Sequence, residues 1–91
     1  MNREQAKTLN VMAAGVLQAV DAAGSLGAPG GILYAGLMSS GCSFENYEMI
    51  MGRLQSSGLV KRSGECYTLT DKGVRLNTQI TAAIQAHQAA A

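Results

Sequence analysis

The stretch SFENYEMIMGRLQSSGLVKRSGECYTLTDKG, from Ser43 to Gly73, limits the possible folds of this chain more than any other segment. Its apolar residues first recur at three- and four-residue steps, as they do on one face of a helix. A glycine then interrupts the pattern, and two short apolar segments follow on either side of Ser63-Gly64. This order predicts an amphipathic helix, a tight β-hairpin and the capped start of another helix.

The amphipathic helix is predicted to begin after Ser43, whose side chain suits the N-cap position. It is predicted to end at Gly58, because glycine favours the backbone conformation that terminates helices. The apolar stripe expected to face the core consists of Phe44, Tyr47, Ile50, Met51 and Leu54. The residues expected on the opposite side are Glu45, Asn46, Met49, Gly52, Arg53 and Ser56.

The hairpin is predicted from two strands, Leu59 to Arg62 and Glu65 to Leu69, joined by the two-residue turn Ser63-Gly64. This register places Arg62 opposite Glu65, where the two charges would pair. Thr70 then suits the N-cap of a last helix. Its apolar positions are Val74, Leu76, Ile80, Ala83 and Ile84.

Two further helices are predicted before this stretch. The first runs from Arg3 to about Ala23, with apolar residues at Leu9, Met12, Ala13, Val16, Leu17 and Val20. The segment GSLGAPGG that follows is expected to be a flexible connection, because it lacks the GK[ST] ending of a phosphate-binding loop. Pro29 suits the first turn of a short second helix. This helix is expected to be mostly buried, through Ile32, Leu33, Leu37 and Met38.

The chain therefore reads as one domain spanning residues 1–91. Its fold class is mainly α with a small β-hairpin (α+β), in the order α-α-α-β-β-α. Only 14% of the residues are charged and the net charge is +1, which excludes a grossly basic nucleic-acid coat. The charge is unevenly distributed: residues 1–52 carry −2 and residues 53–75 carry +3.

The expected cellular location of the protein and the state of its cysteines follow mainly from signals that the sequence lacks. The polar start MNREQAK does not resemble a secretory signal, and no apolar run approaches the length of a membrane span. The two cysteines, Cys42 and Cys66, form neither a disulfide framework nor a CxxC metal pair. We therefore expect a cytoplasmic protein with reduced thiols and no membrane partner.

Three segments resemble the winged helix-turn-helix family, in particular the small bacterial regulators of the MarR and PadR kind. They are Gly58-Leu59-Val60, Leu69-Thr70-Asp71-Lys72-Gly73 and the helix from Pro29 to Met38. The resemblance covers about residues 26–76. It implies a DNA-binding transcriptional regulator whose third helix enters the major groove and whose hairpin, the wing, contacts the backbone or the minor groove.

Carried over to this chain, the resemblance gives Ser43, Asn46, Met49, Arg53, Lys61 and Arg62 as DNA-binding candidates. The three cations could neutralise phosphates, and Asn46 could read an adenine edge. Glu45 and Glu48 oppose this reading, because they place negative charge on the same helix. The alternative is a winged-helix protein-interaction module that does not bind DNA and that presents the region of Glu45, Met49 and Gly52 to another protein.

The first and last helices, residues 3–23 and 71–90, are Ala-rich and are expected to form a homodimer contact, as the helices outside the core motif often do in the resembling family. A weaker alternative function is thiol-based redox sensing through Cys42, which precedes a helix N-terminus. The lone His87 has no partner at metal-ligand spacing, and no Ser-His-acid arrangement is apparent. We therefore expect no enzyme, no cofactor and no metal site.

Overall fold

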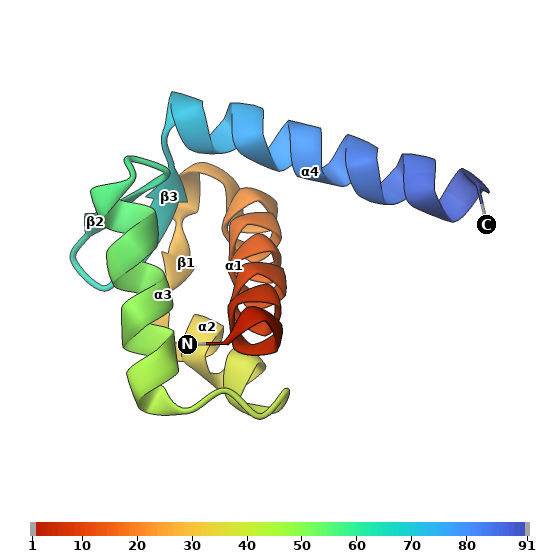
Figure 1. Cartoon of the computed structure of the whole chain (residues 1–91). Coiled ribbons are helices and arrows are strands. Elements are labelled where there is room, and N and C mark those ends of the chain that lie inside the picture. Colours follow the sequence, from red (N-terminus) through yellow and green to blue (C-terminus); the bar gives the residue numbers. More distant parts are fainter. Residues whose placement is uncertain (1, 91) are drawn as a thin grey trace.

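The computed structural model describes residues 2–90, with side chains up to residue 86, and it is mostly helical with one small sheet (Figure 1). The elements in order are α1 (Arg3–Ala23), the 3-10 turn η1 (Gly24–Leu26), β1 (Ala28–Pro29), α2 (Gly30–Met38), α3 (Phe44–Ser56), β2 (Val60–Ser63), β3 (Cys66–Leu69) and α4 (Asp71–Ala90). The sheet is antiparallel with strand order β1-β3-β2. The mainly α, α+β prediction is confirmed, and the order includes an additional strand between the first two helices.

That additional strand, β1, corrects the expectation of a flexible connection between α1 and α2. Ala28 pairs with Tyr67 and Pro29 pairs with Cys66. A residue before proline favours an extended backbone, and proline is tolerated on the edge of a sheet. Gly27 permits the close approach, because its φ is +85° and a Cβ there would lie 2.9 Å from the Cβ of Cys66.

The hairpin forms between β2 and β3, but its register differs from the prediction. Arg62 lies opposite Tyr67 rather than Glu65, and the turn is Gly64-Glu65 instead of Ser63-Gly64. Gly64 has a φ of +63°, whereas no non-glycine residue among those described has positive φ. A glycine at the first central position followed by a residue with negative φ matches a type II′ turn, which suits the twist of a hairpin.

Capping interactions define the helix ends, and the one at the start of α1 was not predicted. The Asn2 side chain accepts a hydrogen bond from the Gln5 backbone N–H (2.8 Å), and the Gln5 side chain accepts one from the Asn2 N–H (3.1 Å), which makes a capping box at the start of α1. The hydroxyl of Thr70 accepts from the Gly73 N–H at 3.1 Å, so Thr70 caps α4 as predicted. Gly58 follows the end of α3 with a φ of +73°.

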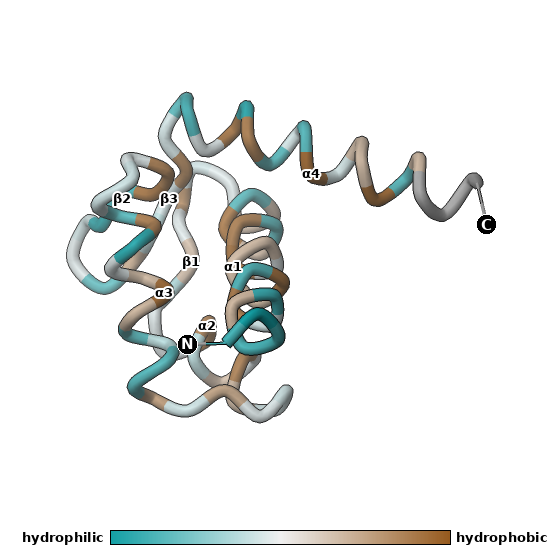
Figure 2. Tube along the Cα trace, in the orientation of Figure 1, coloured by the Kyte–Doolittle hydropathy of each residue, from teal (hydrophilic) through white to brown (hydrophobic). Residues whose placement is uncertain are grey.

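The core lies between α1, α3 and one face of the sheet. Its buried side chains include Val16, Leu17 and Val20 from α1, Tyr47, Ile50, Met51 and Leu54 from α3, and Ala28, Val60 and Tyr67 from the strands. Figure 2 shows hydrophobic residues along the sides of these elements that face one another. The predicted stripes of α1 and α3 are thus largely confirmed.

Three apolar residues predicted to be buried are instead exposed. Phe44 lies at the surface at the start of α3, and Met38 lies at the surface at the end of α2. Ile32 of α2 is 68% exposed, whereas its neighbour Leu33 is buried. The expectation that α2 is mostly buried is therefore wrong, because only one side of the helix faces the body.

Helix α4 packs on the body only along its first half. Leu76 and Ile80 are half-buried against the core, and the C-terminal half extends away from the other elements (Figure 1). Val74 and Ile84, both predicted as apolar positions of this helix, are exposed. Asn77, by contrast, is only 7% exposed.

Helix α1 and the turn after it share the length and composition of a membrane span. The segment Arg3–Leu26 contains an 18-residue stretch with a mean hydropathy of 1.3, so it is long and apolar enough to cross a membrane by length and composition alone. This finding differs from the expectation that no apolar run in the sequence approaches the length of a membrane span. Only 22% of this stretch is buried inside the fold, although Val16, Leu17 and Val20 of the same helix belong to the core.

Candidate nucleic-acid interface

Helix α3 leads directly into the hairpin, and polar contacts fix the junction. The hydroxyl of Thr70 donates to the carbonyl oxygen of Gly58, and the ammonium of Lys72 donates to that of Ser57 at 2.8 Å. These carbonyls belong to the end of α3, where they would otherwise lack partners. Helix α3, the hairpin and the start of α4 are thereby joined at one point.

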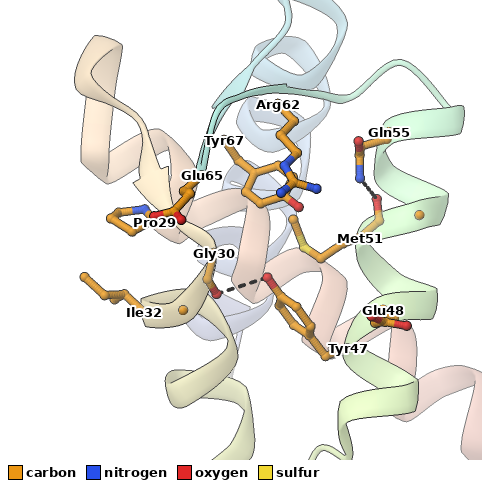
Figure 3. A pocket seen from close by; sticks show the side chains of 12 residues that line it. Pro29, Gly30, Ile32, Tyr47, Glu48, Met51, Gln55, Arg62, Glu65 and Tyr67 are labelled. Atoms are coloured by element: carbon orange, nitrogen blue, oxygen red, sulfur yellow. Dashed lines mark hydrogen bonds between the residues drawn. The ribbon is translucent and has the colours of Figure 1, made fainter.

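An aromatic cluster fixes α3 against α2. The ring centroid of Tyr34 lies 5.3 Å from that of Phe44 and 5.2 Å from that of Tyr47. The Tyr47 hydroxyl also donates to the carbonyl oxygen of Gly30 at 3.0 Å, across the start of α2 (Figure 3). Aromatic pairs and a partly buried hydrogen bond of this kind hold α3 in place against α2.

The α3 candidates do not share one free face. The Ser43 hydroxyl is exposed but accepts the Asn46 backbone N–H at 3.1 Å, so it serves as the predicted N-cap. Asn46 and Met49 are half-buried on the side of α3 that faces α1, which corrects their assignment to the outer side. Arg53 is exposed and borders the same side. The outer side proper carries Glu45, Glu48, Gly52 and Ser56, all exposed.

The two hairpin candidates, Lys61 and Arg62, are both exposed and point to opposite faces of the sheet. Arg62 lies across from Tyr67, on the face that packs on the core, and Lys61 lies across from Thr68 on the other face. The Arg62 Nε donates to the Gly64 carbonyl oxygen at 2.8 Å, and its guanidinium carbon lies 6.0 Å from the centre of the Tyr67 ring. The predicted pairing of Arg62 with Glu65 is therefore replaced by contacts to a carbonyl and a ring.

A groove of about 760 Å³ separates α3 from the hairpin and the start of α2. Figure 3 shows Arg62 and Tyr67 reaching from the hairpin toward Met51 and Tyr47 of α3. Glu65 borders the same groove beside Pro29, and so do Glu48 and Gln55 from α3. The groove thus contains charges of both signs.

Tyr47 is the titratable group most affected by this environment. Burial raises the pKa of its hydroxyl above the usual 10.0, and the nearby Tyr67 raises it further. Arg62 opposes the effect because its positive charge favours the phenolate, whereas Glu48 adds to it. The roles of Tyr47 and Tyr67 in this groove leave no local signal in the sequence, because they depend on which strands pair.

The thiol candidate Cys42 is buried, with 4% of its surface exposed, and its Sγ donates to the Ser43 carbonyl oxygen at 3.4 Å. This placement gives an oxidant little access to the thiol, so it offers no support for a sensor. Cys66 is half-buried in β3. The side chain of His87 lies outside the described part of the chain, within which no group of three or more potential metal-binding side chains occurs.

Comparison with known proteins leaves the family of this chain open. No protein-family model matches it, and no curated protein and no solved structure shows significant similarity to it. Its function is therefore inferred from geometry and charge.

Proposed function

We propose that this protein is a winged-helix DNA-binding protein of the MarR/PadR-like kind that acts as a homodimeric transcriptional regulator. The observation that carries the proposal is the direct joining of a capped, surface-lying helix, α3, to a short β-hairpin. In a winged helix these two elements form adjacent ridges, of which one enters the major groove and the other lies along the backbone. The short hairpin and its paired third strand fit that arrangement.

The charge distribution favours phosphate contacts from the hairpin more than base reading by α3. Lys61 and Arg62 project from the two faces of the hairpin, so both can approach a DNA backbone that runs past its tip. Arg53 adds one cation on α3. Because few phosphates are contacted per subunit, binding by one subunit is weak and two subunits act together.

Duplex binding across a salt series tests this proposal. The double variant Lys61→Ala/Arg62→Ala should bind a fluorescently labelled duplex more weakly, with a slope against log salt that is shallower by about 0.9 for each phosphate that the variant no longer neutralises. The matched control is Arg3→Ala/Lys7→Ala, which removes the same charge from the start of α1. Equally weakened binding in both double variants, or no salt-dependent binding by the wild type, would refute the DNA-binding proposal.

The homodimer is proposed to form through α1 and α4. Val11 on α1 is 66% exposed and Ile84 on α4 is 41% exposed, and hydrophobic residues recur along the extended half of α4 (Figure 2). Light scattering at tens of micromolar protein should give twice the chain mass. Ile84→Asp should shift the mass toward that of a monomer, whereas Leu26→Asp, on an exposed apolar residue outside both helices, should not.

A protein-interaction module is the second candidate, and one observation favours it. The outer side of α3 presents Glu45 and Glu48, both exposed, in the position where DNA phosphates would come closest. A basic surface of another protein would suit these two carboxylates better than a duplex does. A folded protein without any salt-dependent duplex binding would favour this candidate.

A further inference from the structure

The groove between α3, the hairpin and the start of α2 has apolar and acidic features that the proposed DNA contacts do not use. Its floor is formed by Tyr47, Met51 and Tyr67, which are all buried. On the α2 side it is bordered by Ile32, which is 68% exposed. The volume of about 760 Å³ is within the range of ligand sites, so the groove can hold several side chains of an occupant.

Two glycines keep the walls of this groove open. Gly31 of α2 and Gly52 of α3 line it, and apart from their chain neighbours and their own helices no atom lies within 4 Å of a Cβ built at either position. Neither glycine has a positive φ, and at an interior helix position such as 52 glycine is less favourable than alanine. Local geometry therefore does not require these two glycines, whereas they permit the close approach of another chain.

The charged side chains of the groove favour a cationic occupant. Glu48 of α3 and Glu65 of the hairpin lie on opposite sides of it (Figure 3). Arg62, the one cation among the described residues that line the groove, contacts the Gly64 carbonyl oxygen and the Tyr67 ring. The two carboxylates can therefore pair with cations of an occupant, and they would repel the phosphates of a nucleic-acid strand at the same place.

We infer that this groove binds an extended, basic segment of a partner protein, in which apolar side chains alternate with lysine or arginine. Successive side chains of an extended chain point to opposite sides, so the apolar ones lie on the floor of the groove. The long basic side chains reach back to Glu48 and Glu65 at its edges. The backbone of the segment passes over Gly31 and Gly52, where no side chain blocks it.

This assignment goes beyond the proposed DNA binding and does not depend on it, because the segment binds without a duplex. It also differs from a basic protein surface laid on the outer side of α3, because half of the site belongs to the hairpin and to the start of α2. The net charge of the whole chain is +1, so a basic segment has no general attraction to the protein and depends on the local carboxylates.

An amide NMR titration of the full chain with the acetylated, amidated peptide Gly-Leu-Lys-Leu-Lys-Gly tests the inference. We expect saturable shifts of the Gly31, Gly52 and Glu65 amides, with a dissociation constant below about 1 mM at low salt. A peptide with both lysines replaced by glutamine should bind about tenfold more weakly, because it lacks the charges. A peptide with both leucines replaced by serine should also bind about tenfold more weakly, because it leaves the apolar floor uncovered.

Charge variants locate the site on the protein. Glu48→Gln and Glu65→Gln should each weaken binding of the lysine peptide about two- to fivefold, and the double variant should weaken it about tenfold. The matched control is Glu45→Gln, which removes the same charge from α3 outside the groove and should leave the affinity unchanged.

A steric variant provides a test that does not depend on charge. Gly52→Leu places a side chain in the open space of the groove and should abolish peptide binding. Gly36→Leu is the control, because position 36 is equally open but lies on α2 outside this groove. The amide spectrum of each variant reports directly whether the fold is intact.

Several results would overturn the inference. They are equal affinity for the lysine and glutamine peptides, unchanged binding in Glu48→Gln/Glu65→Gln, or peptide shifts confined to residues outside the groove. A DNA duplex that shifts the Gly31 and Gly52 amides, while the peptide does not, would assign the groove to DNA and would also overturn it. Failure of the DNA-binding proposal is distinguished by the salt series with a duplex, which the peptide titration does not involve.

Discussion

The backbone of Gly73, at the start of α4, lies directly against the carbonyl group of Leu59, at the start of the hairpin. A Cβ at position 73 would come to 3.0 Å from the Leu59 carbonyl carbon and closer still to its oxygen. The same oxygen accepts the Thr70 backbone N–H at 3.1 Å. The contact joins α4 to the base of the hairpin, and it explains why a glycine occupies the first turn of a helix.

Replacing Gly73 should therefore destabilise the protein, although alanine is the better helix former. The Gly73→Ala methyl group would meet backbone atoms that cannot rotate away, so the hairpin or α4 must shift. We expect the free energy of unfolding, measured by urea denaturation, to fall by roughly 1–3 kcal/mol.

The matched control is Gly15→Ala, in the middle of α1. Apart from the chain neighbours of Gly15 and the backbone of its own helix, no atom lies within 4 Å of a Cβ built there. The change should therefore stabilise the protein by up to about 1 kcal/mol through helix propensity. A Gly73→Ala variant that is as stable as Gly15→Ala would contradict the tight contact with Leu59.

Replacement of Asn77, unlike that of Gly73, should stabilise the protein. This residue is buried in the first half of α4, and its Oδ1 has no hydrogen-bond partner among the described residues. A buried amide oxygen without a partner costs free energy that an apolar side chain of similar size does not. Asn77→Leu should therefore raise the free energy of unfolding by about 1 kcal/mol.

Thermal and urea denaturation would measure the effect of Asn77→Leu. Asn77→Asp is the informative companion, because it keeps the shape of the side chain and places a charge at the same buried position. It should lower the stability markedly at neutral pH. A lower melting temperature for Asn77→Leu than for the wild type would show that the amide makes a favourable interaction that leucine cannot make.

The helix ends were predictable because their signals are local. Ser43 and Thr70 cap the helices that follow them, and Gly58 follows the end of α3, each within three residues of the backbone groups it affects. The buried sides of α1 and α3 were predictable for a similar reason, because polar residues alternate with apolar ones at the helical period.

Strand β1, the buried side of α2 and the hairpin register were not predicted correctly, because each depends on residues that are distant in the sequence or on the type of turn that forms. A two-residue strand has no period, so the pairing of Ala28 with Tyr67 left no local signal. In α2 nearly every residue is apolar or glycine, and the pattern could not distinguish the buried Leu33 from the exposed Ile32. The hairpin register was predicted wrongly because Gly64 can belong to either of two turns, Ser63-Gly64 or Gly64-Glu65. The turn type that forms, with Gly64 at the first central position, decides between them.

The candidate site was located only in part for the same reason. Helical spacing put Asn46 and Met49 outside the apolar stripe of α3, but it did not reveal that α1 packs beside them. In the hairpin, the exposure of Lys61 and Arg62 was predictable, whereas the contact of Arg62 with Tyr67 required the true register. Tertiary packing therefore decides which candidates share a surface.

The Tyr47 hydroxyl should make stability depend on alkaline pH. Since burial raises the pKa of this hydroxyl above 10.0, the folded state favours the neutral form. The corresponding stability is fully present below pH 10 and is lost as the pH rises through the raised pKa of the folded state. The neutral hydroxyl also donates to the Gly30 carbonyl oxygen, a bond that the phenolate cannot make.

Tyr47→Phe should therefore be less stable than the wild type at neutral pH, by about 0.5–1.5 kcal/mol for the missing hydrogen bond. The difference should shrink as the pH rises above 10, because only the wild type must release the proton of this hydroxyl on unfolding. Urea denaturation from neutral pH to about pH 11 would measure it. A difference that stays constant over this range would contradict the assigned direction of the pKa.

Glu45 and Glu48 distinguish the two proposed functions most sharply, because both carboxylates lie on the outer side of α3. If α3 lies in the groove of a duplex, Glu45→Gln/Glu48→Gln removes repulsion from the phosphates. Duplex affinity should then rise roughly three- to tenfold at low salt, and less at high salt. Anisotropy titrations at both salt concentrations measure the duplex affinity. Circular dichroism must first show that α3 stays intact when the Glu45 charge is removed from its first turn.

The control for this pair is Glu4→Gln/Asp21→Asn, which removes two negative charges from α1. Net charge changes equally in both double variants, so a general electrostatic effect would raise duplex affinity equally. A larger rise for the α3 pair would place that helix next to the phosphates. Equal rises would place it away from them, and an unchanged affinity in the α3 pair would leave its two carboxylates as a surface for a basic protein partner.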